Sequence, residues 1–175
     1  MAGSLIKIQE VEISSAVASV TLGGSEWDSS YDVYMIQLSN VEIDSASKYL
    51  VMRVTENGTP NTSAYYDASY KNIKSSGLTN SSYSNLTYFY TINNVMGNTA
   101  NQTFNGVKYI FNANNSNQYT FFTNEVSAYS NPSTLWGNTG SELYQSKSQI
   151  DGVQFFLWDT GNIDNGIISI YGLRN

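Results

Sequence analysis

The fold class follows from alternating stretches such as LIKIQEVEI, residues 5–13, in which polar and apolar side chains take turns. A period of two directs one face of a β-strand toward a core and the other toward water. The apolar parity changes between Ile8 and Val11, which predicts a β-bulge or a break into two short strands. We therefore expect residues 5–13 to form β-structure with one irregularity.

Similar alternation recurs along the chain, and no stretch of eleven or more residues carries an apolar stripe at helical spacing. The other predicted strands cover residues 17–22, 33–38, 49–54, 107–111, 118–126, 152–158 and 167–171, with an edge strand near residues 142–148. About nine or ten short strands separated by turns are typical of a sandwich or jelly roll. The sequence thus predicts an all-β chain, a single domain over residues 1–175, built as an antiparallel two-sheet sandwich of jelly-roll type.

Two segments lack a clear strand pattern. Residues 59–105 alternate short tyrosine-bearing runs with Asn/Ser/Gly segments, and we interpret residues 80–85 as a surface loop. The polar stretch between Phe122 and Ile150 is interpreted as a loop that holds Trp136, followed by the edge strand.

The composition excludes several kinds of chemistry. The 175 residues include no cysteine and no histidine, which removes disulfides, thiolate metal sites, the common zinc sites and the catalytic triads built on histidine. The net charge of -6 and the scattered lysines oppose nucleic-acid binding. We expect no cofactor, no metal and no catalytic residues.

The same composition favours binding to other proteins. No run approaches the roughly 20 apolar residues of a membrane span, and the first residues lack the apolar core of a signal peptide, so we expect synthesis in a cytosol and no membrane partner. Charged residues make up only 13% of the chain, whereas tyrosine occurs fourteen times. Tyrosine offers a large contact area with a polar tip, which suits a surface covered by neighbouring subunits.

The end of the chain carries DGVQFF at residues 151–156, GNI at 161–163 and GIISIYGL at 166–173. Together with LIKI at 5–8, VASV at 17–20 and YDVY at 31–34, this pattern resembles the small jelly-roll virion proteins of tailed bacteriophages. The resemblance covers both ends of the chain and matches the middle only in its Asn/Ser/Gly-rich style. We expect the last two predicted strands, residues 152–158 and 167–171, to form a hairpin.

The resemblance implies a structural protein of the virion. The leading hypothesis is a capsid decoration or cement protein on the capsid surface, a homo-oligomer such as a trimer that contacts the major capsid protein or other virion proteins, and no enzyme. The alternative is a tail-fibre or head-fibre domain that binds host surface glycans. A third hypothesis, a glycan hydrolase, lacks a recognisable pair of carboxylates.

Candidate contact residues are aromatic or lie beside aromatic residues. They are Trp27, Asp28, Tyr65, Tyr66, Tyr70, Tyr83, Tyr88 and Trp136. Trp27 and Asp28 either take a sugar or cover the edge of the core. Trp136, with the loop of residues 131–136, either anchors a partner or folds back on its own sheet. The tyrosines either supply a subunit interface or are half-buried strand residues.

One further segment, residues 159–166, has oxygen-bearing side chains such as Asp159, Asn162 and Asp164. Its spacing does not fit the calcium loop of an EF-hand. Turns favour the same residue types for backbone reasons, so the sequence favours a plain turn over a calcium site.

Overall fold

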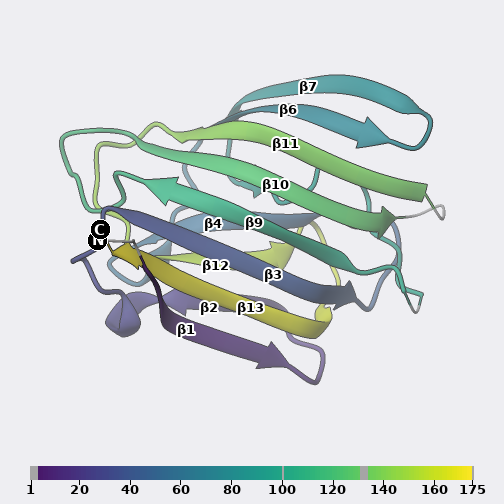
Figure 1. The fold of residues 1–175 in the computed structure, drawn as a ribbon, viewed down its shortest axis with the longest axis horizontal. Helices are drawn as coiled ribbons and strands as arrows, with labels where there is room; N and C mark the ends of the chain where they lie inside the picture. The colour runs from purple at the N-terminus through teal and green to yellow at the C-terminus, as the bar shows by residue number, and fades with distance from the viewer. Residues whose placement is uncertain (1–3, 100, 131–133, 175) are drawn as a thin grey trace.

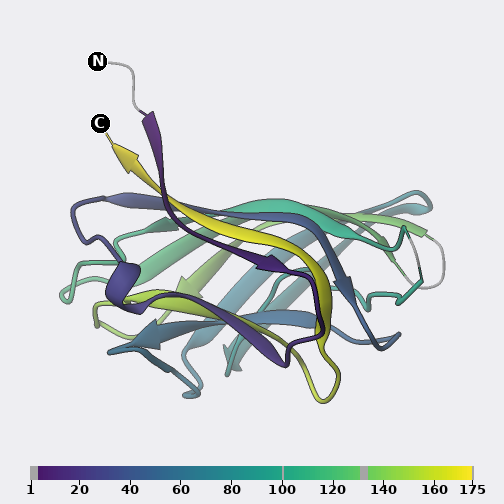
Figure 2. The same cartoon turned by 90° about the horizontal axis from the view of Figure 1, so that it is seen from below.

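The computed structural model describes residues 4–99, 101–130 and 134–174. Strands make up 64% of the chain and helix 2%, which confirms the predicted all-β class. Two antiparallel sheets pack face to face, as Figure 2 shows from the side. We call the eight-stranded layer sheet A and the smaller layer sheet B.

Sheet A has the strand order β1-β13-β3-β9-β10-β11-β6-β7 (Figure 1). In chain order its strands are β1 (Ser4–Ile13), β3 (Val33–Ile43), β6 (Tyr66–Lys74), β7 (Gly77–Leu86), β9 (Phe104–Phe111), β10 (Thr120–Ser130), β11 (Thr134–Tyr144) and β13 (Ile163–Arg174).

Sheet B has the order β2-β12-β4-β5, and β8 also pairs with β4. Its strands are β2 (Ser19–Gly23), β4 (Leu50–Glu56), β5 (Thr59–Pro60), β8 (Phe89–Tyr90) and β12 (Gly152–Leu157). A short 3-10 helix, η1 (Gly24–Glu26), follows β2. The interior between the sheets is one cluster of buried apolar side chains to which both sheets contribute.

The irregularity predicted in residues 5–13 is confirmed. The register between β1 and β13 shifts between Lys7 and Gln9, so Ile8 is the extra residue of a β-bulge. Because of this shift, odd-numbered Ile13 points into the core, although the alternation before the bulge would place even-numbered residues such as Ile8 there.

The hairpin predicted at the end of the chain is wrong. β12 lies in sheet B between β2 and β4, whereas β13 lies in sheet A between β1 and β3. The backbone of Asp159 and Gly161 adopts positive φ in the link, as the turn residues suggested, but the link carries the chain from one layer to the other. The inward direction predicted for Val153, Phe155 and Leu157 is confirmed, because all three are buried.

Both segments that we interpreted as loops lie in strands, as far as the structure describes them. Residues 80–85 lie in β7, and Trp136 lies in β11, which pairs with β10 along eleven residues and with β6 on its other side. Of the edge strand predicted near residues 142–148, residues 142–144 are the end of this longer, internal strand, and residues 145–148 lie beyond it. These strands carry Asn, Ser, Thr and Gly on both faces, so hydrophobic alternation could not reveal them.

Candidate functional site

Alternate residues of sheet A point away from the core and form what we call the outer face. The alternation is complete in β10, where even-numbered residues are buried and odd-numbered residues are exposed. In Figure 2 sheet A is the upper of two layers, and no further layer of the described chain lies over it. This face is therefore available to a partner.

An apolar row crosses the outer face from strand to strand. Its members are direct cross-strand partners on β1, β13, β3, β9, β10 and β11: Leu5, Leu173, Val33, Phe111, Phe121 and Leu143. Leu5 is 46% exposed and Phe121 47%, and the other four are half-buried. Neighbouring apolar side chains in register make a continuous stripe rather than scattered surface residues, which is the pattern of a protein contact.

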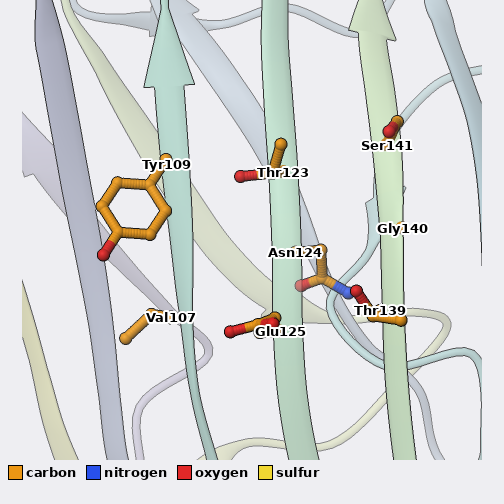
Figure 3. A pocket seen from close by; sticks show the side chains of 8 residues that line it. All are labelled: Val107, Tyr109, Thr123, Asn124, Glu125, Thr139, Gly140 and Ser141. Carbon is orange, nitrogen blue, oxygen red and sulfur yellow. The ribbon is translucent and has the colours of Figure 1, made fainter.

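A groove of about 470 Å³ lies beside this row over β9, β10 and β11. Figure 3 shows its lining, which consists of Val107, Tyr109, Thr123, Asn124, Glu125, Thr139, Gly140 and Ser141. In register, Tyr109 faces Thr123, and Val107 faces Glu125. The groove thus combines one aromatic ring with hydroxyl groups and a carboxylate, groups that can stack under a sugar ring and bind its hydroxyls.

The groove does not offer the usual arrangement for glycoside hydrolysis. Glu125 is the single carboxylate among the residues that line it. The common mechanisms need two carboxyl groups on either side of the scissile bond. The groove is therefore a candidate for binding a saccharide.

Trp27 packs against the edge of the core, which is one of the two roles that the sequence allowed for it. Its ring stacks on Tyr34 with centroids 4.0 Å apart, and its Nε1 donates to Asn114 Oδ1 at 3.0 Å. Asn114 Nδ2 in turn donates to the Tyr34 hydroxyl at 2.7 Å, and burial raises the pKa of Tyr34 to about 12. The Asp28 carboxylate accepts from the Ser30 backbone at 2.9 Å. Trp27 and Asp28 thus both take part in the local structure of the segment between η1 and β3.

The predicted tyrosine surface is mostly interior. Tyr66, Tyr70 and Tyr88 are buried, so the contact role predicted for them is wrong. Tyr66 and Tyr70 share the inward parity of β6, which points them at the core. Tyr83 is half-buried, with its hydroxyl 2.6 Å from Asn93 Oδ1, and Tyr65 is 41% exposed. Tyr65 is the most exposed of the candidate tyrosines.

Trp136 also belongs to the sheet. It is half-buried on β11, packs against the core, and its ring lies 4.2 Å from Lys74 Nζ. It therefore folds back on its own sheet. Residues 131–133 of the proposed contact loop lie outside the described residues, whereas the following Leu135 is exposed.

The segment of residues 159–166 is held by hydrogen bonds within the fold. The Asp44 carboxylate accepts from the Asn162 backbone and side chain at 2.8 and 2.7 Å, which lowers the pKa of Asp44. Asp159 pairs with Lys48 at 3.1 Å. Across the described ranges, no three side chains of the metal-binding types gather around one point.

No protein-family model, curated protein or solved structure matches this chain. None of the described residues belongs to a helix with the length and hydropathy of a membrane span. The fold and the outer face therefore provide the basis for a functional assignment.

Proposed function

We propose that this chain is a bacteriophage virion structural protein, a capsid decoration or cement protein that binds the capsid surface and other copies of itself. The observation that carries the proposal is the apolar row across six strands of the outer face. A contiguous apolar patch of this kind marks a protein-binding surface. Its burial against the major capsid protein, or between subunits of a homo-oligomer such as a trimer, stabilises the assembled shell by linkage.

The proposal includes a fold of jelly-roll type. Support comes from eight strands that pair first with last: β1 with β13, β2 with β12, β3 with β9, and β4 with β8. The successive pairs alternate between sheet A and sheet B. A nested antiparallel pairing that alternates between two sheets is the plan of a jelly roll. On this plan β6, β7, β10 and β11 are additions that widen sheet A, and with it the outer face.

The resemblance to phage virion proteins rests on the two ends of the chain, and the fold brings these ends together. β1 pairs with β13, and Leu5 lies opposite Leu173. β2 pairs with β12 in the other sheet. The segments that carry the resemblance thus form one contiguous part of the sandwich, which supports their interpretation as a single module.

The first test replaces Phe121 with serine. We expect the affinity for shells stripped of the protein to fall by about tenfold or more, because a central apolar contact is lost. Stability of the isolated chain should change little, because Phe121 is 47% exposed. Co-sedimentation with stripped shells measures the affinity, and thermal unfolding measures the stability.

Trp158→Ser is the matched control, because Trp158 is similarly exposed, at 49%, but lies outside sheet A. It should bind the shells like the wild type. If the Phe121→Ser variant binds stripped shells as tightly as the wild type, the apolar row is not part of the contact with the shell. Shells that withstand heat equally with and without the protein would remove the cementing role.

A second candidate function, adhesion to host surface glycans by a tail-fibre or head-fibre domain, is favoured by the groove over β9–β11. Tyr109→Ala should remove the stacking platform and weaken glycan binding at least tenfold, about 1.4 kcal/mol or more. Tyr119→Ala is the control, because Tyr119 is exposed but does not line the groove. A glycan array measures glycan binding by the wild type and both variants. If the wild type binds no glycan on the array, the adhesion hypothesis is contradicted.

A further inference from the structure

Three polar side chains are buried side by side on the inner face of sheet A. Lys108 on β9 is 0% exposed, Asn124 on β10 is 1% and Glu142 on β11 is 2%. Lys108 Nζ lies 2.5 Å from Glu142 Oε1, with both side chains fully enclosed. Asn124 also borders the groove of the outer face, whereas Lys108 and Glu142 have no part in it. Buried charges are costly unless they are well paired or take part in chemistry.

The register brings the lysine and the amide together. Lys108 and Asn124 are direct cross-strand partners, so their Cβ atoms are about 4.5–5.5 Å apart. Glu142 lies on the strand beyond β10, so the Lys108 side chain crosses over β10 beside Asn124 to reach it. The residue opposite Asn124 on β11 is Gly140, whose missing side chain makes room for the Tyr70 ring from β6. The Lys108 amine and the Asn124 carboxamide thus share the inner face of two paired strands, and we place them within reach of each other through this register.

The hydrogen bonding of the cluster is incomplete. Asn124 Oδ1 and Glu142 Oε2 are buried and accept no hydrogen bond from any described residue. Asn124 Nδ2 donates to Asn138 Oδ1, which fixes the amide plane. Buried polar atoms without partners are rare in folded proteins and call for a reason such as chemistry at the site. Asn124 Oδ1 is therefore open to a donor, and a hydrogen bond from protonated Glu142 would polarise the carbonyl toward attack.

The surroundings make it easier for the Lys108 ammonium to pass a proton to Glu142. The Tyr70 hydroxyl donates to Glu142 Oε1 at 2.7 Å, and the buried rings of Phe104 and Phe122 lie on the same strands as Lys108 and Asn124. Burial lowers the pKa of Lys108, and burial beside Glu142 raises the pKa of Tyr70 well above its usual range, so Tyr70 stays a donor. A desolvated lysine that passes a proton to a neighbouring carboxylate becomes a competent nucleophile.

We propose that Lys108 and Asn124 join in an intramolecular isopeptide bond, with Glu142 as the proton carrier. The Lys108 Nζ lone pair attacks Asn124 Cγ and forms the new C–N bond. Glu142 takes a proton from Nζ and delivers a proton to Nδ2. The Cγ–Nδ2 bond then breaks, and its electron pair leaves with ammonia. A primary amine and a primary amide thus become one secondary amide and ammonia, without an oxidant or a cofactor.

The fold supplies what this reaction needs. Two reacting groups on paired strands have the effective concentration of an intramolecular reaction, and the dry interior strengthens the proton transfers. The product ties β9 to β10, where the added strands β10, β11, β6 and β7 join the rest of sheet A. The covalent tie holds the widened outer face together under force.

The experiment is intact-mass spectrometry of the folded wild-type chain. We expect a mass lower than the sequence mass by one ammonia molecule. Trypsin should also fail to cut after Lys108, the sole lysine or arginine between Lys74 and Lys147, and should release residues 75–147 as one peptide. The full sequence mass with normal cleavage after Lys108 would overturn the proposal.

Variants distinguish the mass loss caused by this bond from the mass loss caused by other reactions that release ammonia. Asn-Gly pairs at residues 57–58, 105–106 and 165–166 can form cyclic imides of the same mass. Lys108→Arg should therefore restore the full mass, and a loss that persists in it would count against the bond. Glu142→Gln keeps the side-chain volume and should also show the full mass, whereas a cross-link in that variant would contradict the role of Glu142. Asn124→Asp should lose water in place of ammonia.

Discussion

Replacing Tyr66 with alanine is expected to destabilise the fold by about 3–5 kcal/mol, the usual cost of emptying a large aromatic site. The Tyr66 ring lies 4.9 Å from Phe89 and 5.0 Å from Tyr144, so it joins sheet A to sheet B. Its hydroxyl donates to the Asn61 carbonyl at 2.7 Å and accepts from the Val54 amide at 3.3 Å. Denaturant unfolding of the wild type and the variant measures the difference.

The adjacent Tyr65 provides the control. It lies just before β6 and is 41% exposed, with its ring 6.1 Å from that of Tyr144, so Tyr65→Ala should cost about 1 kcal/mol or less. Similar losses for the two variants would contradict the inward placement of Tyr66. They would return both tyrosines to the surface role that the sequence first indicated.

A second large effect is expected at the buried ion pair. Lys108→Met leaves Glu142 as an uncompensated buried charge, which costs about 3–5 kcal/mol. The double variant Lys108→Met/Glu142→Leu removes both charges and should recover most of that loss, because apolar residues often replace a buried pair well. Neither variant can form the isopeptide bond, so the comparison isolates the charge.

Thermal or denaturant unfolding of the two variants at neutral pH gives the comparison. If both variants are as stable as the wild type, Glu142 reaches water, and the enclosed cluster on the inner face does not exist. If both variants lose the same large amount of stability, the loss comes from packing rather than from charge.

The sequence predicted the strands that alternate clearly and missed those that do not. Residues 5–13, 33–38 and 152–158 alternate or are apolar, and they form β1, β3 and β12 close to their predicted positions. β7 and β11 are polar on both faces, so only their pairing partners make them strands. The period of two indicates a strand but not its sheet, which is why β12 and β13 were expected to form a hairpin.

The candidate site was harder to predict than the fold. Tyrosine enrichment suggests a surface role, whereas the parity of Tyr66 and Tyr70 in β6 places both on one face of that strand. A usable signal was present at Lys108, which shares the parity of Phe104 and Ile110 in β9 and so falls among core positions. The apolar row could not be found from sequence, because it depends on the register of six strands from distant parts of the chain.

Copy number per particle tests the proposed function most directly. Quantitative mass spectrometry of purified virions should find the chain in stoichiometric excess over tail proteins, on the order of hundreds of copies, because a symmetric shell repeats its binding site. Absence from the virion, or a copy number as low as that of a tail appendage, would contradict the assignment to the capsid surface.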